Sequence, residues 1–97
     1  MGKQKQLQEN RENILAIAAK HGAFNVRIFG SVARGEDTPE SDIDLLIDYD
    51  IEKTTPWFPV GLIRDLENLL QTKVDVVTVE GLKNRIRDQV LQESINL

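Results

Sequence analysis

The stretch FGSVARGEDTPESDIDLLIDYD, residues 29–50, joins the end of one apolar segment to the start of the next and places aspartates at the second junction. Because side chains alternate along a strand, Ile43 and Leu45 are expected to face the core, and Asp42 and Asp44 to share the opposite face. Their α-carbons would then be roughly 6 to 7 Å apart. Aspartate is uncommon in strands, and two such close carboxylates repel one another. The pair therefore calls for a compensating cation.

The flanking sequence alternates between helical and strand periodicity. Helical spacing of apolar residues predicts helices over residues 7–21, from Pro56 to residue 70, and over 82–90, with a short helical segment at 31–35. Short runs rich in β-branched residues predict strands at 25–29, 43–49 and 73–79. This order is typical of a mixed α/β (α+β) domain, with a short mixed three-stranded sheet and helices packed on it.

Composition narrows the possible functions. The chain has 97 residues, of which 40% are hydrophobic, so we expect a single domain over residues 1–97. It contains no cysteine, which favours a reducing cytoplasm. A net charge of −4 without a dominant basic stripe argues against direct nucleic-acid binding. No run is long enough to span a bilayer, and the N-terminal residues lack the apolar core of a signal peptide, so no membrane association is expected.

The paired carboxylates indicate a hard divalent cation. Mg²⁺ is commonly held by carboxylates together with substrate phosphates, and Asp42 and Asp44 could supply the protein ligands. Asp75 is a lone carboxylate among the valines of the third predicted strand. If that strand lies beside the second, Asp75 completes a cluster of three carboxylates.

The upstream Gly-Ser pair is consistent with phosphate binding. Gly30 allows a close turn after the first strand, and Ser31 begins a short segment whose N–H groups and hydroxyl could hold phosphate oxygens. Ser31 could equally be a helix cap. Arg34 could reach the same phosphates or pair with Glu36 or Asp37. The stretch is neither a P-loop, which needs Gly-Lys-Ser/Thr, nor an EF-hand, which needs a central Gly and a closing Glu.

These residues together resemble a known signature. A Gly-Ser at a strand-to-helix turn, ten residues and then Asp-x-Asp resembles that of the polymerase-beta-like nucleotidyltransferases, and GSVARGEDTPESDID matches it without insertion or deletion. With ARG, SDIDLL and VDVV, the chain is similar to the minimal nucleotidyltransferases, the antitoxin partners of HEPN toxins. The resemblance covers nearly the whole chain. It implies that Asp42, Asp44 and Asp75 hold two metal ions, and that Gly30 and Ser31 bind nucleotide phosphates.

The resemblance also implies a reaction. Members of this branch are similar to protein adenylyltransferases that move AMP from ATP onto a tyrosine of the cognate HEPN ribonuclease, with Mg²⁺ or Mn²⁺, and so silence it. A hetero-oligomer with that toxin is therefore expected. Two alternatives remain open at this point: an antitoxin that acts only by occlusion, and a nucleotidyltransferase that modifies a small molecule such as an antibiotic.

For three further groups of residues, the sequence predicts a structural position but no role in the site. His21 is expected at a helix C-terminus without a carboxylate partner. Trp57 and Phe58 are expected in the core or at an interface rather than as a shelf for base stacking. The basic residues of the last helix are expected to form a solvated face; they are Lys83, Arg85 and Arg87.

Overall fold

A mixed four-stranded sheet lies at the centre of the protein, which a computed structural model describes over residues 2–97. The strand order is β3-β2-β1-β4. The central strand β2 runs parallel to β3 and antiparallel to β1, and β1 is antiparallel to β4. The bounds of the strands are Ala23–Phe29 for β1, Ile43–Tyr49 for β2, Val74–Thr78 for β3 and Ile95–Asn96 for β4.

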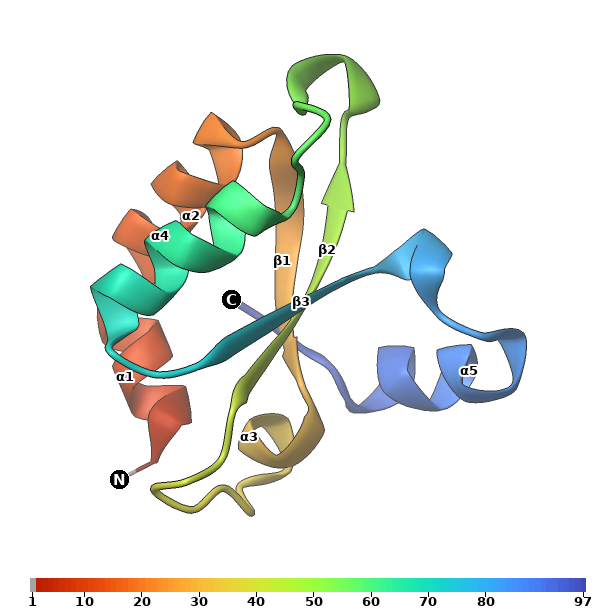
Figure 1. Cartoon of the computed structure of the whole chain (residues 1–97). Helices are drawn as coiled ribbons and strands as arrows, with labels where there is room; N and C mark the ends of the chain where they lie inside the picture. The colour runs from red at the N-terminus through yellow and green to blue at the C-terminus, as the bar shows by residue number, and fades with distance from the viewer. Residues whose placement is uncertain (1) are drawn as a thin grey trace.

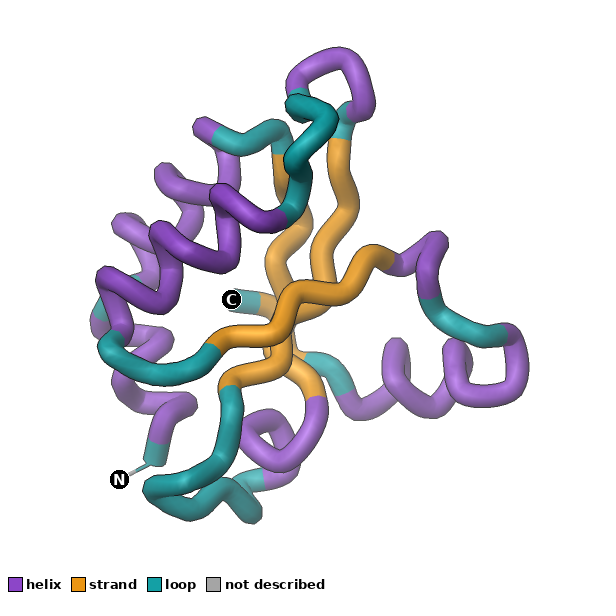
Figure 2. Tube along the Cα trace, in the orientation of Figure 1, coloured by secondary structure: helices purple, strands orange, loops and turns teal. Residues whose placement is uncertain are grey.

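Helices cover one face of this sheet and flank its other parts (Figures 1 and 2). Helices α1, α2 and α4 form a layer on one side, while α3 lies at the end of the sheet where β2 begins. Helix α5 lies on the right of the view, away from that layer but in contact with α3. Two short 3-10 helices, η1 and η2, follow β2 and β3. The helix bounds are Lys3–Glu9 for α1, Arg11–Lys20 for α2, Gly30–Arg34 for α3, Val60–Leu70 for α4, Asn84–Glu93 for α5, Ile51–Lys53 for η1 and Val79–Gly81 for η2.

The α+β class and the three predicted strands are confirmed, but the number of strands is wrong. The fourth strand has only two residues, Ile95 and Asn96, which pair with Ile28 and Arg27 of β1. Two residues are too few to show an alternating pattern, so only the pairing with a distant strand reveals them. No helix within residues 2–97 has the length and hydropathy needed to cross a membrane.

Several predicted helix boundaries are wrong. The last helix, expected over residues 82–90, is α5 at Asn84–Glu93 and leaves Leu82 outside it. The helix expected over residues 7–21 is divided at Asn10, whose side chain donates a hydrogen bond to the carbonyl of Gln6 at 2.9 Å. Asparagine competes with the backbone for such bonds, and this favours helix ends. The helix expected from Pro56 begins instead at Val60, after Pro59 at the N-cap position.

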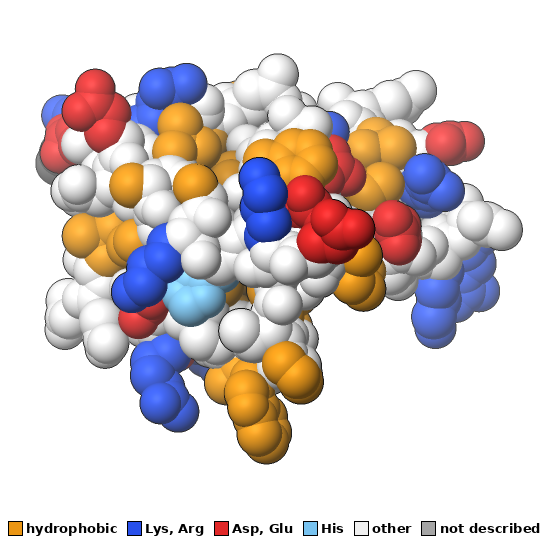
Figure 3. All heavy atoms as spheres, turned by 90° about the horizontal axis from the view of Figure 1, so that it is seen from above, with side chains coloured by type: hydrophobic (Ala, Val, Ile, Leu, Met, Phe, Trp, Pro, Cys, Tyr) orange, Lys and Arg blue, Asp and Glu red, His pale blue; other side chains and the backbone are white. Residues whose placement is uncertain are grey.

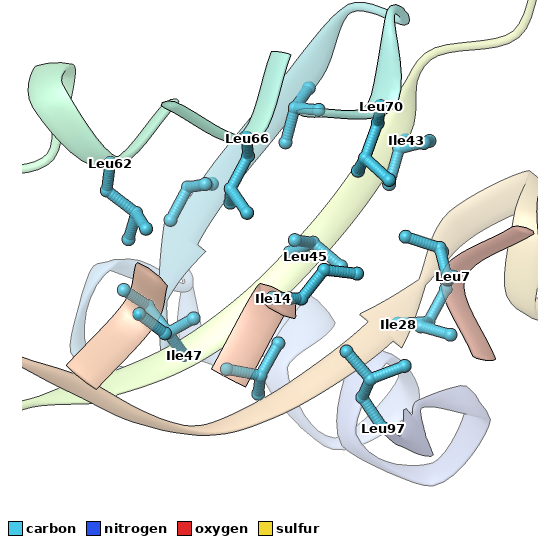
Figure 4. Packing of buried hydrophobic residues seen from close by; sticks show 14 of the residues in the cluster. Leu7, Ile14, Ile28, Ile43, Leu45, Ile47, Leu62, Leu66, Leu70 and Leu97 are labelled. Carbon is cyan, nitrogen blue, oxygen red and sulfur yellow. The ribbon is translucent and has the colours of Figure 1, made fainter. Parts of the chain in front are cut away.

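The core lies between the sheet and the layer of helices (Figure 4). Ile43, Leu45 and Ile47 are buried on this side of β2, as the alternation predicts. Helix α4 contributes leucines one turn apart, and these are fully buried: Leu62, Leu66 and Leu70.

Leu46 departs from this simple alternation. It points to the other face of the sheet but is also fully buried, beside its strand neighbours Arg27 and Val77. The second face of β2 is therefore not uniformly polar.

The expectation that His21 lacks a carboxylate partner is wrong. Nε2 of His21 donates a hydrogen bond of 2.7 Å to Oδ2 of Asp65, which ties the C-terminus of α2 to α4. This hydrogen bond, aided by the charge of Lys20, lowers the pKa of Asp65 below its ordinary value. The sequence separation of 44 residues hid the pair from local pattern analysis.

A first prediction follows from this pair. Because the folded protein lowers the pKa of Asp65, its ionised form stabilises the fold above the ordinary aspartate pKa of about 3.9, and that stabilisation is lost as the pH falls through the folded value. Asp65→Asn should therefore have a lower free energy of unfolding than the wild type at pH 6, and this difference should become smaller toward pH 3. Urea unfolding across this pH range measures the difference, with the exposed Asp88→Asn as control. A difference that does not change with pH would contradict a stabilising role for the ionised Asp65.

Candidate functional site

The three predicted metal-binding carboxylates come from two neighbouring strands. Asp42 immediately precedes β2, Asp44 is its second residue, and Asp75 is the second residue of β3. The parallel register sets Asp44 directly beside Asp75. Asp42 and Asp75 are exposed, whereas Asp44 is half-buried. The expectation that the third strand lies beside the second is thus confirmed, and Asp75 is the neighbour of Asp44.

Gly30 brings the start of α3 against Asp44. The last residue of β1, Phe29, is the register partner of Asp44, so the chain turns into α3 directly over that carboxylate. Gly30 has a φ of +74°, and a Cβ at this position would overlap Oδ2 of Asp44 and lie 3.2 Å from its Cγ. Glycine satisfies both the left-handed backbone and the close approach. The space that a side chain would fill holds the carboxylate.

The surroundings of Asp44 disfavour its ionised form. Its partial burial raises its pKa above the ordinary value, and the charges of Asp75 and Asp42 raise it further. Arg34 acts in the opposite direction but does not cancel these effects. An uncompensated cluster of negative charge is therefore present at the point where β1, β2 and β3 meet α3.

Arg34 links two helices near this cluster. Its Nε donates to Oε1 of Glu36 at 2.8 Å, and its Nη1 donates to Oε1 of Glu93 in α5 at 3.2 Å. These two acidic partners raise the pKa of Arg34, the hydrogen bond to Glu36 most strongly. Pairing with Glu36 was one of the two expected roles. Asp37, the other expected partner, accepts instead from the backbone N–H of Lys3. The sequence offered no signal for Glu93, which is 59 residues away.

Ser31 does not cap α3. The helix begins at Gly30 with Phe29 at the N-cap position, so Ser31 lies within the first turn. The first N–H groups of a helix have no partner within it and remain able to bind oxygen atoms. A phosphate-binding role for Gly30, Ser31 and Arg34 therefore stays a prediction.

The donor set fits Mg²⁺ only in part. Among residues 2–97, no three His, Cys, Asp or Glu side chains form a group that could hold a metal ion. Mg²⁺, however, is often bound through one or two carboxylates, with waters and substrate phosphates completing its coordination. Asp42 and Asp44 fit that arrangement when a triphosphate supplies further oxygens. Completion of the site by Asp75 stays a prediction.

Comparisons with known proteins identify relatives of this chain. The sequence profile of the nucleotidyltransferase domain family matches residues 11–97. A protein of Methanocaldococcus jannaschii, provisionally named a protein adenylyltransferase, is 33% identical over 94 residues, which are 94% of this chain and 97% of that protein. The protein adenylyltransferase MntA of Thermococcus cleftensis is 35% identical over 92 residues, which are 90% of this chain and 92% of that protein.

Solved structures support the same fold. A protein provisionally described as a minimal nucleotidyltransferase is 46% identical and superposes with a TM-score of 0.84, covering 97% of this chain and 95% of that chain. A toxin-antitoxin crystallised with AMP-PNP superposes with a TM-score of 0.74 over 90% of this chain and 71% of that chain. The second is only 20% identical, so this likeness concerns the fold alone.

A second prediction compares two glycines with the same backbone. Gly30 and Gly35 have φ values of +74° and +71°, but a Cβ at Gly35 would meet nothing within 4 Å. Gly35→Ala should cost about 1 to 2 kcal/mol of folding free energy for the left-handed backbone alone. Gly30→Ala should cost about 1 to 3 kcal/mol more because the methyl group displaces Asp44. Urea unfolding of both variants measures the difference, and equal losses would contradict the close approach.

A third prediction concerns the repulsion at Asp44. Because its raised pKa means that its charge opposes folding at neutral pH, Asp44→Asn should raise the Tm of the metal-free protein. Addition of Mg²⁺ with ATP should raise the Tm of the wild type and leave that of the variant nearly unchanged. Glu40→Gln, an exposed change in the preceding loop, serves as control. A lower Tm for Asp44→Asn would make Asp44 a structural residue.

Proposed function

The chain belongs to the nucleotidyltransferase domain family, and we propose that it transfers AMP from ATP to a hydroxyl group of a partner protein. The observation that carries this proposal is the half-buried carboxylate of Asp44, set between Asp75 and the close turn at Gly30. Relatives named protein adenylyltransferases match nearly the full length of the chain. The proposal also includes the cytoplasm as the place of reaction.

The acceptor is proposed to be a tyrosine of a HEPN ribonuclease, for which this chain is the antitoxin. The sequence resemblance to minimal nucleotidyltransferases supports this, and the fold is shared with a toxin-antitoxin crystallised with AMP-PNP. The chain's own tyrosine is a poor acceptor. Tyr49 is half-buried, with its ring 5.2 Å from that of Phe58, and it lies five residues beyond Asp44, roughly 16 Å along the strand.

In the proposed reaction, an oxygen of the acceptor tyrosine bonds to the α-phosphorus of ATP. The bond from the α-phosphorus to the bridging oxygen breaks, and pyrophosphate leaves with that electron pair. Asp75, whose side chain is exposed, accepts the phenolic proton. The N–H groups at the start of α3, with the hydroxyl of Ser31, hold the phosphates in line.

Asp42 and Asp44 would hold Mg²⁺ or Mn²⁺, with two ions expected in the complete site. When bound, the metal offsets the negative charge of the triphosphate and of the carboxylates, and lowers the pKa of the attacking hydroxyl. A tyrosine with an ordinary pKa of about 10 needs such help at neutral pH. This requirement supports a metal-dependent reaction.

A fourth prediction tests the transfer directly. Incubation of this chain and a cognate HEPN ribonuclease with ATP and Mg²⁺ should raise the toxin's mass by one or more AMP units and abolish its ribonuclease activity. Asp44→Asn should lose both effects, because it lacks a metal ligand, and a toxin variant with the acceptor tyrosine changed to phenylalanine should gain no mass. Intact-mass and peptide spectrometry make the measurement.

The same experiment separates catalysis from occlusion. If the toxin is silenced at unchanged mass, and equally well by Asp44→Asn, the chain acts by binding alone and the transferase proposal is wrong.

A further inference from the structure

One end of the molecule exposes apolar side chains that the catalytic cluster does not use. Ile51 in η1 is 73% exposed and Trp57 in the following loop is 77% exposed. Val60, at the start of α4, and Phe24, near the start of β1, are about half exposed. We call this group, together with the neighbouring acidic residues described below, the η1-end surface. Large apolar side chains grouped at one end of a small domain are a common sign of an interaction site.

A hollow lies beside these side chains. It has a volume of about 280 Å³ and opens between the ends of β1, β2 and β3. Phe24, Tyr49 and Val79 form its apolar wall, while Asp48 and Glu80 contribute carboxylates. The ring of Tyr49 also packs against Phe58, so the hollow is connected to the loop that carries Trp57.

Carboxylates surround the exposed apolar groups. Asp48 and Glu80 line the hollow, and Asp50 and Glu52 lie at the start of η1, where Asp50 accepts the N–H of Glu52. Lys53 is the basic residue of this turn, and Arg27 offsets Asp48 in part through a contact of 3.5 Å. Figure 3, seen from this end, shows acidic side chains gathered near the middle of the face beside hydrophobic ones and a basic one, and a further hydrophobic group that projects at the lower edge.

The negative charge of this surface indicates which kind of molecule could bind to it. In a two-fold pairing with a second copy, the same carboxylates would face one another, and such like-charge contacts are costly. RNA and anionic lipid would be repelled as well. A protein that presents apolar side chains flanked by Lys or Arg would be complementary, with one basic side chain entering the hollow between the aromatic rings and the carboxylates.

We propose that the η1-end surface docks the partner protein that receives AMP, and that this partner contributes an apolar centre with a basic rim. This inference rests on the proposed function for the existence of that partner. The surface lies at the far end of β2 from the catalytic cluster, since Asp48 follows Asp44 by four residues, roughly 13 Å along the strand. A partner bound here leaves the nucleotide site open.

In this arrangement, the η1-end surface binds the partner and the carboxylates around Asp44 take part in its modification. Contacts at Trp57 and Ile51 supply affinity through buried apolar area, as exposed aromatic side chains often do at interfaces. The acidic rim guides the approach of the basic partner and selects against other surfaces. The acceptor side chain then reaches Asp44 from a partner that is already bound, which raises its effective concentration at the site.

The fifth prediction is a change in affinity for the HEPN protein proposed above as the partner. Trp57→Ala and the charge reversal Glu80→Lys should each weaken the complex on the order of tenfold or more, by calorimetry or surface plasmon resonance. The effect of Glu80→Lys should shrink as salt is raised, because it removes a charge contact. Binding of ATP with Mg²⁺ should be unchanged in both variants.

Matched controls come from other exposed positions. Ile86→Ala in α5 removes a comparable apolar group, and Glu9→Lys in α1 makes the same change of charge. Both should bind the HEPN protein like the wild type. Circular dichroism melts of all four variants establish that each is folded, and Glu80→Lys keeps the test valid should Trp57→Ala be destabilised.

The possible results are distinct. If the wild type binds the HEPN protein and Trp57→Ala and Glu80→Lys bind equally well, the docking surface is elsewhere while the proposed function stands. If the wild type binds ATP with Mg²⁺ but not the HEPN protein, the proposed partner is wrong and the inference falls with it. If the wild type is a dimer that Trp57→Ala converts to a monomer, the surface joins two copies and the inference is overturned.

Discussion

The pairing of β2 with two different neighbours is the constraint on which the site depends. Its antiparallel register with β1 sets Asp44 opposite Phe29, and its parallel register with β3 sets Asp44 beside Asp75. A shift of either register by one residue would turn a carboxylate toward the core and an isoleucine or leucine toward the site. The burial of Ile43, Leu45 and Ile47 against the helices resists such a shift. The same apolar residues that stabilise the sheet therefore determine where the charges lie.

The carboxylate cluster lowers the stability of the fold. Burial and like charges oppose the ionised form of Asp44, and α3 is drawn so close to it that only glycine fits at position 30. Neighbouring core residues provide the stabilisation that such a site needs, including Ile28 of β1 and Val32 of α3, both fully buried. On the proposed function, an arrangement that is unfavourable in the free protein would become favourable when a cation and a triphosphate enter, which is typical of functional sites.

Local periodicity predicted much of the fold, and the family resemblance pointed to the residues of the candidate site. The alternation over residues 43–49 gave the correct strand and core face, and the resemblance singled out Gly30 and Asp44, which the structure brings together. Other features depend on contacts between distant segments, and no local pattern reveals these. The short strand β4, the pair of His21 with Asp65, and the bond from Arg34 to Glu93 are of this kind. The interruption at Asn10 shows a different limit. Residues 8–13 contain no apolar residue, so the spacing left this stretch open, and the side chain of Asn10 bonds there to the carbonyl of Gln6.

The described residues form one sheet, and on the proposed function its central strand β2 serves two separate tasks. Its first residues carry carboxylates next to α3, and its last residues lie beside an aromatic hollow and the exposed loop that follows. Because a strand is extended, its two ends are far enough apart for a nucleotide at one and a protein at the other, yet they belong to one rigid element. On the proposed function, a substrate protein held at the η1 end would thus be presented to Asp44 in a constant geometry. On the proposed function, the partner would supply the acceptor, and the extended central strand would set its distance from the nucleotide site.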